Sequence, residues 1–511
     1  MANTEMSKKE SLYIKKVNKR KLSGSLEFTT ARLSWQVTLA FAVFCALKSV
    51  WTMKDGESAT LWIAATAVYG IGFLLQYFIN SKIIKEITSD AGEIKSSTRK
   101  LGWLLLPFIV TGDFFMFAAG CMLIKKEKNI EYQLGIYSLQ VTIYILIISA
   151  LNLFKETQSD TFWLGMGLYG LYAILNLVIL GAVNKYTFGK KPDKKFMPFA
   201  VICVAGILLG NVFSFLLGII TIGKYRNKNE EISVNWIDVI RRLFKNYMAV
   251  VGMFVVIFLL SVSIASSLTF DYAVATSNNF AARLAEPSLM YPFGCDDYGR
   301  CVFTRIIFGA RISLIVGVVS TLAPIIVGGL LGAIAGYYGG RTENIIMRVL
   351  DVLNAVPSIL LAIAIIAALG ASTTSLIIAL SIGGVASYAR TVRAQVMGVA
   401  NQEFVEAAKA CGAKDTTIIL RHIIPNSLAP VIVRATMGIG SAVLSTSSFS
   451  YLGIGVEPHI PEWGNILKAG SKFLESNPYI AIFPGLAIII IVLSFNYFGD
   501  GLRDALDPKL K

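Results

Sequence analysis

The chain of 511 residues carries little charge, since Asp, Glu, Lys and Arg make up only 15% of it. Soluble globular proteins contain about 25% of these residues. Hydrophobic residues account for 55% of the chain, and the mean hydropathy is +0.63. They gather into runs of about twenty, the length with which a helix crosses the hydrocarbon core while its backbone groups stay paired internally. The composition therefore excludes a soluble globular protein and predicts an all-α polytopic membrane protein.

Residue types that build metal and catalytic sites are also scarce. The chain has two histidines, His422 and His459, and its six cysteines are scattered. Neither a metal-ligand cluster nor a disulfide framework follows from their spacing. The sequence also lacks a GxxxxGK[ST] phosphate-binding loop. We therefore expect that this chain binds no cofactor or metal, hydrolyses no ATP itself and is not an enzyme.

The N-terminus lacks the apolar core and cleavage site of a signal peptide. Instead, residues 1–33 are basic through Lys8, Lys9, Lys15, Lys16, Lys19, Arg20 and Lys21. The net charge is +15, but the Lys and Arg residues lie mainly between the apolar runs. That distribution is typical of cytoplasmic loops beside membrane lipid, and it argues against a nucleic-acid partner.

About twelve apolar runs divide the chain into two sets of six. The first set is 34–52, 59–80, 101–124, 134–154, 161–183 and 197–222. The second set is 247–269, 311–339, 352–370, 373–389, 428–455 and 479–498. We expect a basic cytoplasmic N-terminus (1–33), an N-terminal membrane domain of about six helices (34–225), a cytoplasmic linker (226–246) and a second membrane domain (247–511). The two halves show no sequence echo of each other.

The Lys and Arg residues predict the orientation. With the linker inside, the cytoplasmic loops of the second half collect Arg341, Arg348, Arg390, Arg393, Lys409, Lys414 and Arg421. Both termini are then expected in the cytoplasm. In the first half, even alternation places five lysines outside, namely Lys185, Lys190, Lys191, Lys194 and Lys195. Either one span is misassigned or the charge bias is broken there.

A polar, basic segment at 401–425 lies between two long apolar runs. Good helix formers up to Cys411 are followed by Gly412, which supplies a left-handed backbone position and ends one short helix before the next begins near Asp415. Pro425 fits the first turn of the following helix. The pattern predicts a compact helix–turn–helix across the membrane face, with small side chains that let a soluble partner approach closely.

The sequence of this segment, EAAKACGAKDTTIILRHIIP (406–425), resembles the EAA loop of bacterial ABC importer permeases. Further matches follow the order of the smaller permease of oligopeptide and dipeptide importers, the OppC/DppC branch. They are PFGCDDYGRCVFTRIIFGARISLIVG (292–317), AIAGYYGG (333–340), NAVPSILLAI (354–363), SYLGIG (450–455) and PEWGNIL (461–467). The resemblance covers about residues 236–511.

This resemblance implies that the last six helices form the transmembrane domain of a type I ABC importer in the bacterial cytoplasmic membrane. It implies four kinds of partner: a second, OppB/DppB-like permease, two OppD/OppF-like ATPase subunits that bind ATP and Mg, an extracellular solute-binding protein and membrane lipid. The residues expected to couple to the ATPase are Glu406, Ala407, Ala408, Gly412, Ala413 and Arg421. Short peptides are the expected substrate. Nickel or another small solute, or transport as a secondary transporter, remains an alternative.

Four residues are candidates for the translocation pathway: Pro357, Ser358, Arg434 and Thr446. Arg434 lies within an apolar run, where a charge is costly and marks either a functional site or a side chain that snorkels to the interface. Arg434 and Thr446 also depart from the residues common in the resembling branch. In the first half, Asp113 is likewise a charged residue within an apolar run. Three roles are open for its carboxyl group: a structural hydrogen bond, an ion site or a proton relay.

Two pairs on the predicted outer face complete the candidates. Cys295 and Cys301 lie six positions apart in a polar loop and form either a disulfide or two free thiols. Glu462 and Trp463 are candidates for docking the solute-binding protein, although Trp463 fits an interfacial anchor equally well.

Overall fold

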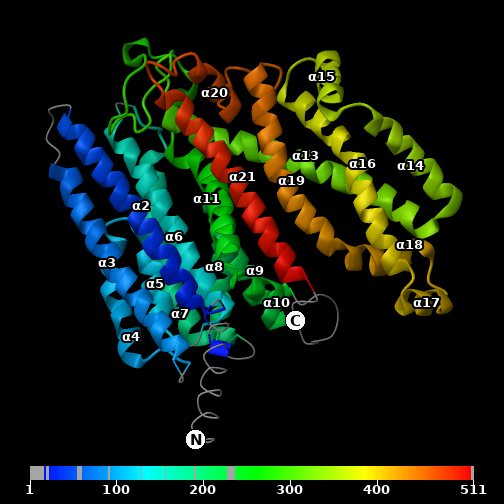
Figure 1. The fold of residues 1–511 in the computed structure, drawn as a ribbon, viewed down its shortest axis with the longest axis horizontal. Helices are drawn as coiled ribbons and strands as arrows, with labels where there is room; N and C mark the ends of the chain where they lie inside the picture. The colour runs from blue at the N-terminus through cyan, green and yellow to red at the C-terminus, as the bar shows by residue number, and fades with distance from the viewer. Residues whose placement is uncertain are drawn as a thin grey trace, which may run out of the picture. The chain divides into compact units, whose positions relative to one another are not determined.

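The structure is a computed structural model that describes residues 17–18, 22, 24–54, 60–89, 92–126, 128–155, 157–188, 192–226 and 236–507 (Figure 1). Several expectations lie outside the described residues. They are the N-terminal basic residues Lys8, Lys9, Lys15, Lys16, Lys19, Arg20 and Lys21, the linker residues 227–235, Lys190 and Lys191, and the C-terminal residues 508–511.

The described residues form helices and contain no β-strand, which confirms the all-α fold class. Nine of their helices are long and apolar enough to cross a membrane, and a bent helix pair raises the number to ten. The predicted total of about twelve transmembrane helices is therefore not confirmed by the described residues. The chain divides into two compact units. Unit 1 is 1–147, 169–230 and 236–250, and unit 2 is 148–168, 231–235 and 251–511.

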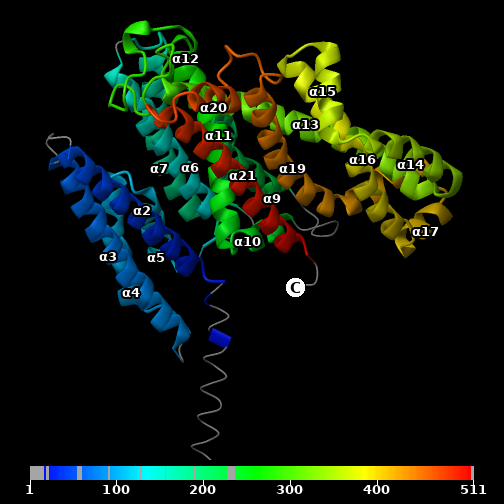
Figure 2. The same cartoon turned by 45° about the horizontal axis from the view of Figure 1, so that its top comes forward.

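Residues 26–226 contain the same order of elements twice: two long helices followed by a hairpin of short helices (Figure 2). The first copy is α2 (Leu26–Lys54), α3 (Thr60–Thr88), α4 (Ser96–Lys100), η1 (Leu101–Ile109) and α5 (Phe114–Ile124). The second copy is α6 (Ile130–Ala150), η2 (Leu151–Phe154), α7 (Phe162–Tyr186), η3 (Lys194–Phe196), α8 (Met197–Ala205), η4 (Gly206–Leu209) and α9 (Val212–Arg226).

The two copies also share sequence at matching places, which makes them an internal repeat within the first half of the chain. The first helix carries SWQVT at 34–38 in one copy and SLQVT at 138–142 in the other. The second helix carries YGI at 69–71 and YGL at 169–171. These short matches are weak alone, and the shared order of helices gives them meaning.

The hairpins replace two of the predicted spans, 101–124 and 197–222. Each apolar run turns back at a glycine with positive φ, Gly112 at 83° and Gly210 at 75°. The arms of each hairpin pack against one another. An 11-residue helix such as α5 is only about 16 Å long at 1.5 Å per residue, roughly half of the hydrocarbon core. Each run therefore returns to the end from which it came.

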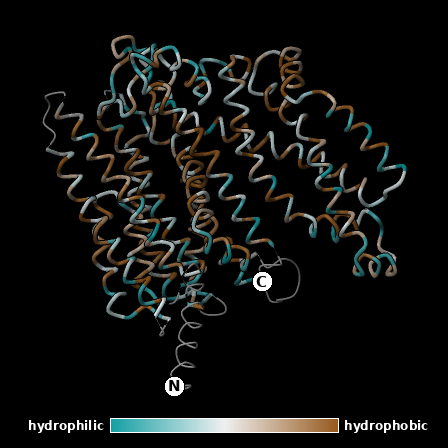
Figure 3. The backbone as a smooth tube through the Cα atoms, viewed as in Figure 1, coloured by the Kyte–Doolittle hydropathy of each residue, from teal (hydrophilic) through white to brown (hydrophobic). Residues whose placement is uncertain are grey.

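This return removes the conflict with the charge bias. The Asn129 side chain donates to the Thr187 carbonyl at 3.0 Å, and the Lys125 ammonium lies 3.5 Å from the centroid of the Phe188 ring. The C-terminal end of α7, which carries Lys185, therefore lies at the same end as the loop between α5 and α6. Figure 3 shows hydrophobic residues along the long helices of unit 1, with hydrophilic residues gathered near their ends.

Unit 2 is built around long helices that pack in the order α13–α16, α13–α19 and α19–α21. Its elements are most of α11 (Tyr247–Thr269), whose first four residues belong to unit 1, and the helices that follow it. These are α12 (Ala273–Thr276), η5 (Phe280–Ala282), α13 (Val302–Tyr338), α14 (Gly340–Ala355), α15 (Ser358–Leu369), α16 (Thr373–Ala400), α17 (Glu403–Ala410), α18 (Asp415–Thr417), the π-helical turn η6 (Ile418–Ile423), α19 (Ile424–Leu452), α20 (Trp463–Ser471) and α21 (Tyr479–Leu506). Helix α10 (Trp236–Leu243) precedes α11 and belongs to unit 1.

Unit 2 also includes residues 148–168 from the end of α6 and the start of α7. Within the unit, Ser149 donates to the Thr269 hydroxyl at 2.9 Å and Asn152 donates to the Thr269 carbonyl at 2.9 Å. The Lys155 ammonium donates to Thr304 at 2.6 Å. This piece of the N-terminal half is therefore tied by buried polar contacts to α11 and α13.

Candidate functional site

The 401–425 segment forms two short helices joined by a tight turn, and α17 lies beyond the end of α16 (Figure 1). Gly412 has φ +78°. Its N–H donates to the Lys409 carbonyl at 2.9 Å, while the Ala413 N–H donates to the Ala408 carbonyl at 3.1 Å. These two bonds make a Schellman motif, which ends α17 and satisfies carbonyls that the helix leaves open.

One face of α17 is packed into unit 2. Val405 is completely buried, as are Ile418 and Ile423 from the following turn. They join a cluster with Val392, Val396, Ala333 and Val431, against which Ala408 and Ala413 pack. This packing attaches the segment to α13, α16 and α19.

The opposite face is open. Phe404, Ala407 and Cys411, which share a face by helical spacing, are all exposed, together with Glu406. Phe404 exposes 38% of its surface. An apolar patch made of one aromatic and small side chains is therefore uncovered in this chain.

Polar contacts fix the turn from the side of α13. Tyr337 donates to one Asp415 oxygen at 2.8 Å and Tyr338 donates to the other at 3.2 Å. The Lys409 ammonium lies 5.0 Å from the centroid of the Tyr337 ring, a cation–π distance. The segment is therefore tied to the end of α13.

The charged residues predicted in this segment point to solvent. Glu406 and Arg421 are exposed, and neither has an ion pair with another residue in the described part of the chain. Gly412 is also exposed, while Ala408 and Ala413 are half-buried. Six predicted residues therefore lie together on one small protrusion, with the two alanines on its inner side.

Arg434 lines a cavity of about 380 Å³ with Asn354, Ser387, Arg390 and Thr391. The Arg434 guanidinium donates to the Ser387 hydroxyl and lies 5.6 Å from the centroid of the Tyr388 ring. No carboxylate lines this cavity or pairs with either arginine within the described residues. The helices α14, α16 and α19 thus bring two positive charges together. The sequence signal for Arg390 was its place near the end of an apolar run.

The other pathway candidates do not join this cavity. Pro357 and Ser358 are exposed at the junction of α14 and α15, where the chain bends by 83°. Thr446 is completely buried, and its hydroxyl donates to the Ala442 carbonyl of its own helix at 2.8 Å.

Cys295 and Cys301 face one another across an isolated antiparallel bridge and are completely buried free thiols. The flanking bonds run from Val302 N–H to the Gly294 carbonyl and from Asp296 N–H to the Arg300 carbonyl, both at 3.0 Å. The cysteines therefore occupy a non-hydrogen-bonded pair, in which side chains lie closest. Burial raises the pKa of the Cys295 thiol. Their disulfide stays a prediction.

Glu462 and Trp463 do not lie on an accessible surface, since both are completely buried. The Glu462 carboxylate caps α20 by accepting from the N–H groups of Gly464 and Asn465. The Trp463 indole donates to the Ile306 carbonyl at 2.9 Å. This placement does not fit the docking role predicted for their side chains, because neither can touch a bound protein directly. Both are instead part of the packing of α20 in unit 2.

Comparison with known protein families gives two matches in the second half of the chain. Residues 328–511 match the family described as the binding-protein-dependent transport system inner membrane component. Residues 235–287 match the N-terminal TM domain of oligopeptide transport permease C.

Curated relatives cover the same part of the chain. A dipeptide transport system permease protein of Alkalihalophilus pseudofirmus is 45% identical over 276 residues, which are 54% of this chain and 90% of that protein. A glutathione transport system permease protein of Escherichia coli is 41% identical over 284 residues, 56% of this chain and 94% of that protein. The family predicted from the sequence motifs is confirmed.

One solved structure, titled as inward-facing conformations of the MetNI methionine ABC transporter, is 18% identical with a TM-score of 0.33. The match covers 40% of this chain and 97% of that chain.

Proposed function

The chain belongs to the family of binding-protein-dependent transport system inner membrane components, and from this premise we propose that it is one permease subunit of an ATP-driven importer. Residues 247–511 form half of the translocation pathway, and the 401–425 segment docks on a cytoplasmic ATPase subunit. A second, homologous permease, two ATPase subunits that bind ATP and Mg, and an extracellular solute-binding protein complete the assembly.

The open face of α17 is the observation that carries this proposal. Phe404 and Ala407 are exposed there, whereas Val405 on the other side is completely buried. A partner that covers this patch gains the hydrophobic effect of burying it. Because the inner face is packed on α13, α16 and α19, a force applied to α17 moves those helices together.

Short peptides are the substrate that we propose. The relatives named above are called dipeptide and glutathione permeases. A short peptide carries a C-terminal carboxylate, and the cavity beside Arg390 and Arg434 offers two guanidinium groups that lack a carboxylate partner among the described residues. Arginine binds carboxylates through paired hydrogen bonds.

The first experiment uses Cys411, which is exposed while the other five cysteines are buried. A membrane-impermeant maleimide should label Cys411 in inside-out vesicles and leave it unlabelled in intact cells. Addition of the ATPase subunits should then protect it. The Cys411→Ser variant controls for labelling elsewhere. Labelling from the outside, or labelling that the ATPase subunits leave unchanged, would contradict the proposed orientation or the docking site respectively.

The second experiment tests coupling. Glu406→Lys should abolish ATP-driven peptide uptake by the assembled transporter while the chain still inserts in the membrane, because the charge is reversed in the middle of the docking face. Glu475→Lys, a charge reversal at another exposed position of unit 2, is the matched control. Normal uptake by the Glu406 variant would count against the proposal.

A further inference from the structure

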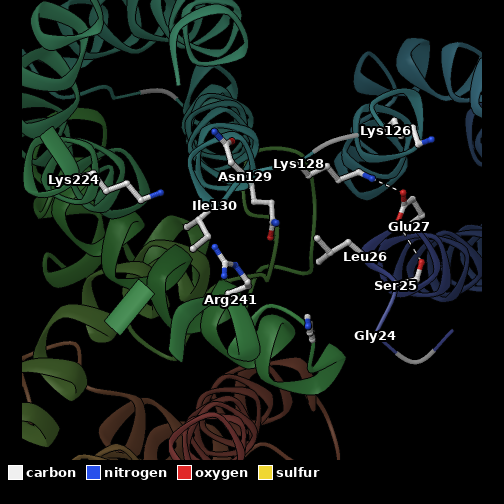
Figure 4. Close-up of a pocket in the computed structure, with 12 residues that line it drawn as sticks. Gly24, Ser25, Leu26, Glu27, Lys126, Lys128, Asn129, Ile130, Lys224 and Arg241 are labelled. Carbon is white, nitrogen blue, oxygen red and sulfur yellow. Dashed lines mark hydrogen bonds and ion pairs between the residues drawn. The ribbon is translucent and has the colours of Figure 1, made fainter. Parts of the chain in front are cut away.

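A second cavity, of about 360 Å³, lies in unit 1 where the ends of its two repeated halves meet (Figure 4). The first copy contributes Gly24–Glu27 at the start of α2, and Lys126 and Lys128 after α5. The second copy contributes Asn129, Ile130 and Gln133 at the start of α6, and Lys224 near the end of α9. Arg241 and Lys245, in and after α10, complete the lining.

The lining is basic, with Lys126, Lys128, Lys224, Arg241 and Lys245 against the single carboxylate of Glu27. In the view of Figure 4, Lys224 lies on one side and the Lys128–Glu27 pair on the other, with Asn129 and Arg241 between them. These residues come from separate segments, so the cluster exists only in the folded unit.

Some of this charge is neutralised and some is not. Lys126 pairs with Glu93 and Arg241 with Asp238 at exposed positions, and Lys224 pairs with Glu131 at 2.5 Å. Glu27, however, pairs with both Lys128 and Arg99. Lys245 is exposed and has no ion pair within the described residues. The cluster therefore has more cations than carboxylates to balance them.

Gln133 provides an independent sign of a missing partner. It exposes only 4% of its surface and lines the cavity, yet its side-chain oxygen accepts no hydrogen bond. A buried acceptor without a partner costs about 1–3 kcal/mol. A ligand that fits this cavity thus combines a negative group for the cations with a hydroxyl that donates to Gln133.

The position of the cavity indicates the class of ligand. It opens at the ends of the membrane helices α2, α6 and α9, close to the Lys- and Arg-rich loops. Basic pockets between membrane helices at this level bind anionic lipid headgroups. Leu26 and Ile130 add an apolar border, as acyl chains require.

We propose that this cavity binds the glycerophosphate headgroup of an anionic phospholipid, with phosphate at the basic residues and a glycerol hydroxyl at Gln133. This function of the N-terminal half is independent of peptide transport. The lipid joins the two repeated halves, because residues from both of them contact one headgroup.

The test measures lipid binding to the purified full chain by native mass spectrometry and by the lipid-dependent shift of its thermal unfolding temperature. Phosphatidylglycerol should bind and stabilise the wild type, while zwitterionic phosphatidylcholine should do neither. Arg241→Gln with Lys245→Gln should weaken phosphatidylglycerol binding by on the order of 30-fold, since each surface cation contributes roughly a factor of five.

Lys194→Gln with Lys195→Gln is the matched control, because it removes two exposed charges from the helical turn η3, which does not line the cavity. It should leave lipid binding unchanged. Equal binding of the two lipids by the wild type, or equal loss in the two double variants, would overturn the proposal. If inorganic phosphate stabilises the chain as well as phosphatidylglycerol does, the ligand of this cavity is a free anion and not a lipid.

Gln133→Leu tests the second contact without removing charge. The wild type should prefer phosphatidylglycerol over phosphatidic acid, whose headgroup lacks the glycerol hydroxyls, and the variant should lose this preference. A preference that survives in Gln133→Leu would reject the assignment of the hydroxyl to this residue. These readouts do not depend on uptake, so they separate this inference from the proposed function.

Discussion

The two hairpin tips of unit 1 have the same architecture but differ in one functional group. In the second copy, Asn211 caps α9 by accepting from the Ser214 N–H at 2.9 Å. In the first copy, Asp113 caps α5 by accepting from the Met116 N–H at 3.1 Å. Both residues follow the positive-φ glycine of the turn, and both are completely buried. An amide in one repeat is thus replaced by a carboxyl group in the other.

The polar network around the amide is closed. Asn211 donates to the Ser138 carbonyl and to the Thr142 hydroxyl, both at 2.8 Å. Asn176 donates to Thr142 at 3.2 Å and accepts from the Ser138 hydroxyl at 2.7 Å. Thr142 then donates its own hydrogen to the Ser138 carbonyl at 2.9 Å. The side chains of this network therefore supply hydrogen-bond partners to one another.

The network around the carboxyl group is open. Thr38 bonds both to the Ser34 carbonyl, at 2.9 Å, and to Asp113. The hydroxyl of Ser34 and the side-chain oxygen of Gln76 are buried without a partner. A threonine hydroxyl has one hydrogen. If Thr38 gives it to Ser34, as Thr142 gives its hydrogen to Ser138, the contact with Asp113 requires a proton on the carboxyl group. The comparison therefore favours a neutral Asp113.

Exchanging the two groups gives the largest expected effect. Asn211→Asp should lower the free energy of unfolding by about 3–5 kcal/mol, because it removes two buried donors and introduces a carboxyl group that lacks a cation partner. Asp113→Asn, the matched control, should change it by less than about 1 kcal/mol, since an amide can donate to Thr38 there. Reversible unfolding in mixed detergent micelles measures both. A large loss in Asp113→Asn would show that the first tip holds a charged group.

The second expected effect concerns the amides on the second helix of each copy. Asn176→Leu should cost about 2–3 kcal/mol, because it removes the acceptor of the buried Ser138 hydroxyl and a donor to the buried Thr142 hydroxyl. Gln76→Leu should cost little, since the Gln76 oxygen has no partner and its amide makes only one long contact, 3.4 Å, to the Ala31 carbonyl. The same unfolding measurement applies. Equal losses would show that the first network is closed by groups outside the protein.

The third effect should be alike in the two copies. A Cβ added at Gly120 would lie 2.8 Å from the Gly102 carbonyl oxygen, and one at Gly218 would lie 2.6 Å from the Ala200 carbonyl oxygen. Alanine at either position should therefore cost about 1–3 kcal/mol by pushing the hairpin arms apart. Gly170→Ala, where an added Cβ meets nothing within 4 Å, is the control. A change at only one of the two sites would argue against equivalent hairpins.

The smallest expected effect concerns the tyrosine hydrogen bond to each hairpin turn. Tyr169 donates to the Leu209 carbonyl at 2.8 Å, and Tyr69 makes the corresponding bond to the Thr111 carbonyl. Tyrosine to phenylalanine should cost about 1 kcal/mol at each position, the usual contribution of one hydrogen bond. Thermal unfolding monitored by circular dichroism can compare the two variants directly. If the losses of stability in the two variants differ by more than about 1 kcal/mol, the two turns are stabilised by different interactions.

Local patterns predicted much of the second half. The turn at Gly412 follows from its place after a helical run, and the structure has the expected left-handed residue there. The small, exposed face with Ala407 could be seen in helical spacing alone. The burial of Glu462 and Trp463 could not be predicted in this way, because a carboxylate beside an aromatic residue is typical of a polar surface. Their partners are distant in the sequence: Ser313 and Ser447 bond to Glu462, and Ile306 bonds to Trp463.

The sequence by itself determined the membrane setting, the all-α class and the family, because hydropathy, run length and short motifs are properties of neighbouring residues. Only the tertiary structure decided that 101–124 and 197–222 turn back at Gly112 and Gly210, since an apolar run has the same composition whether it crosses the membrane or folds on itself. It also gathered the cations around Gln133, because that cavity is built from segments between Gly24 and Lys245 that are distant in the sequence and meet only when unit 1 folds.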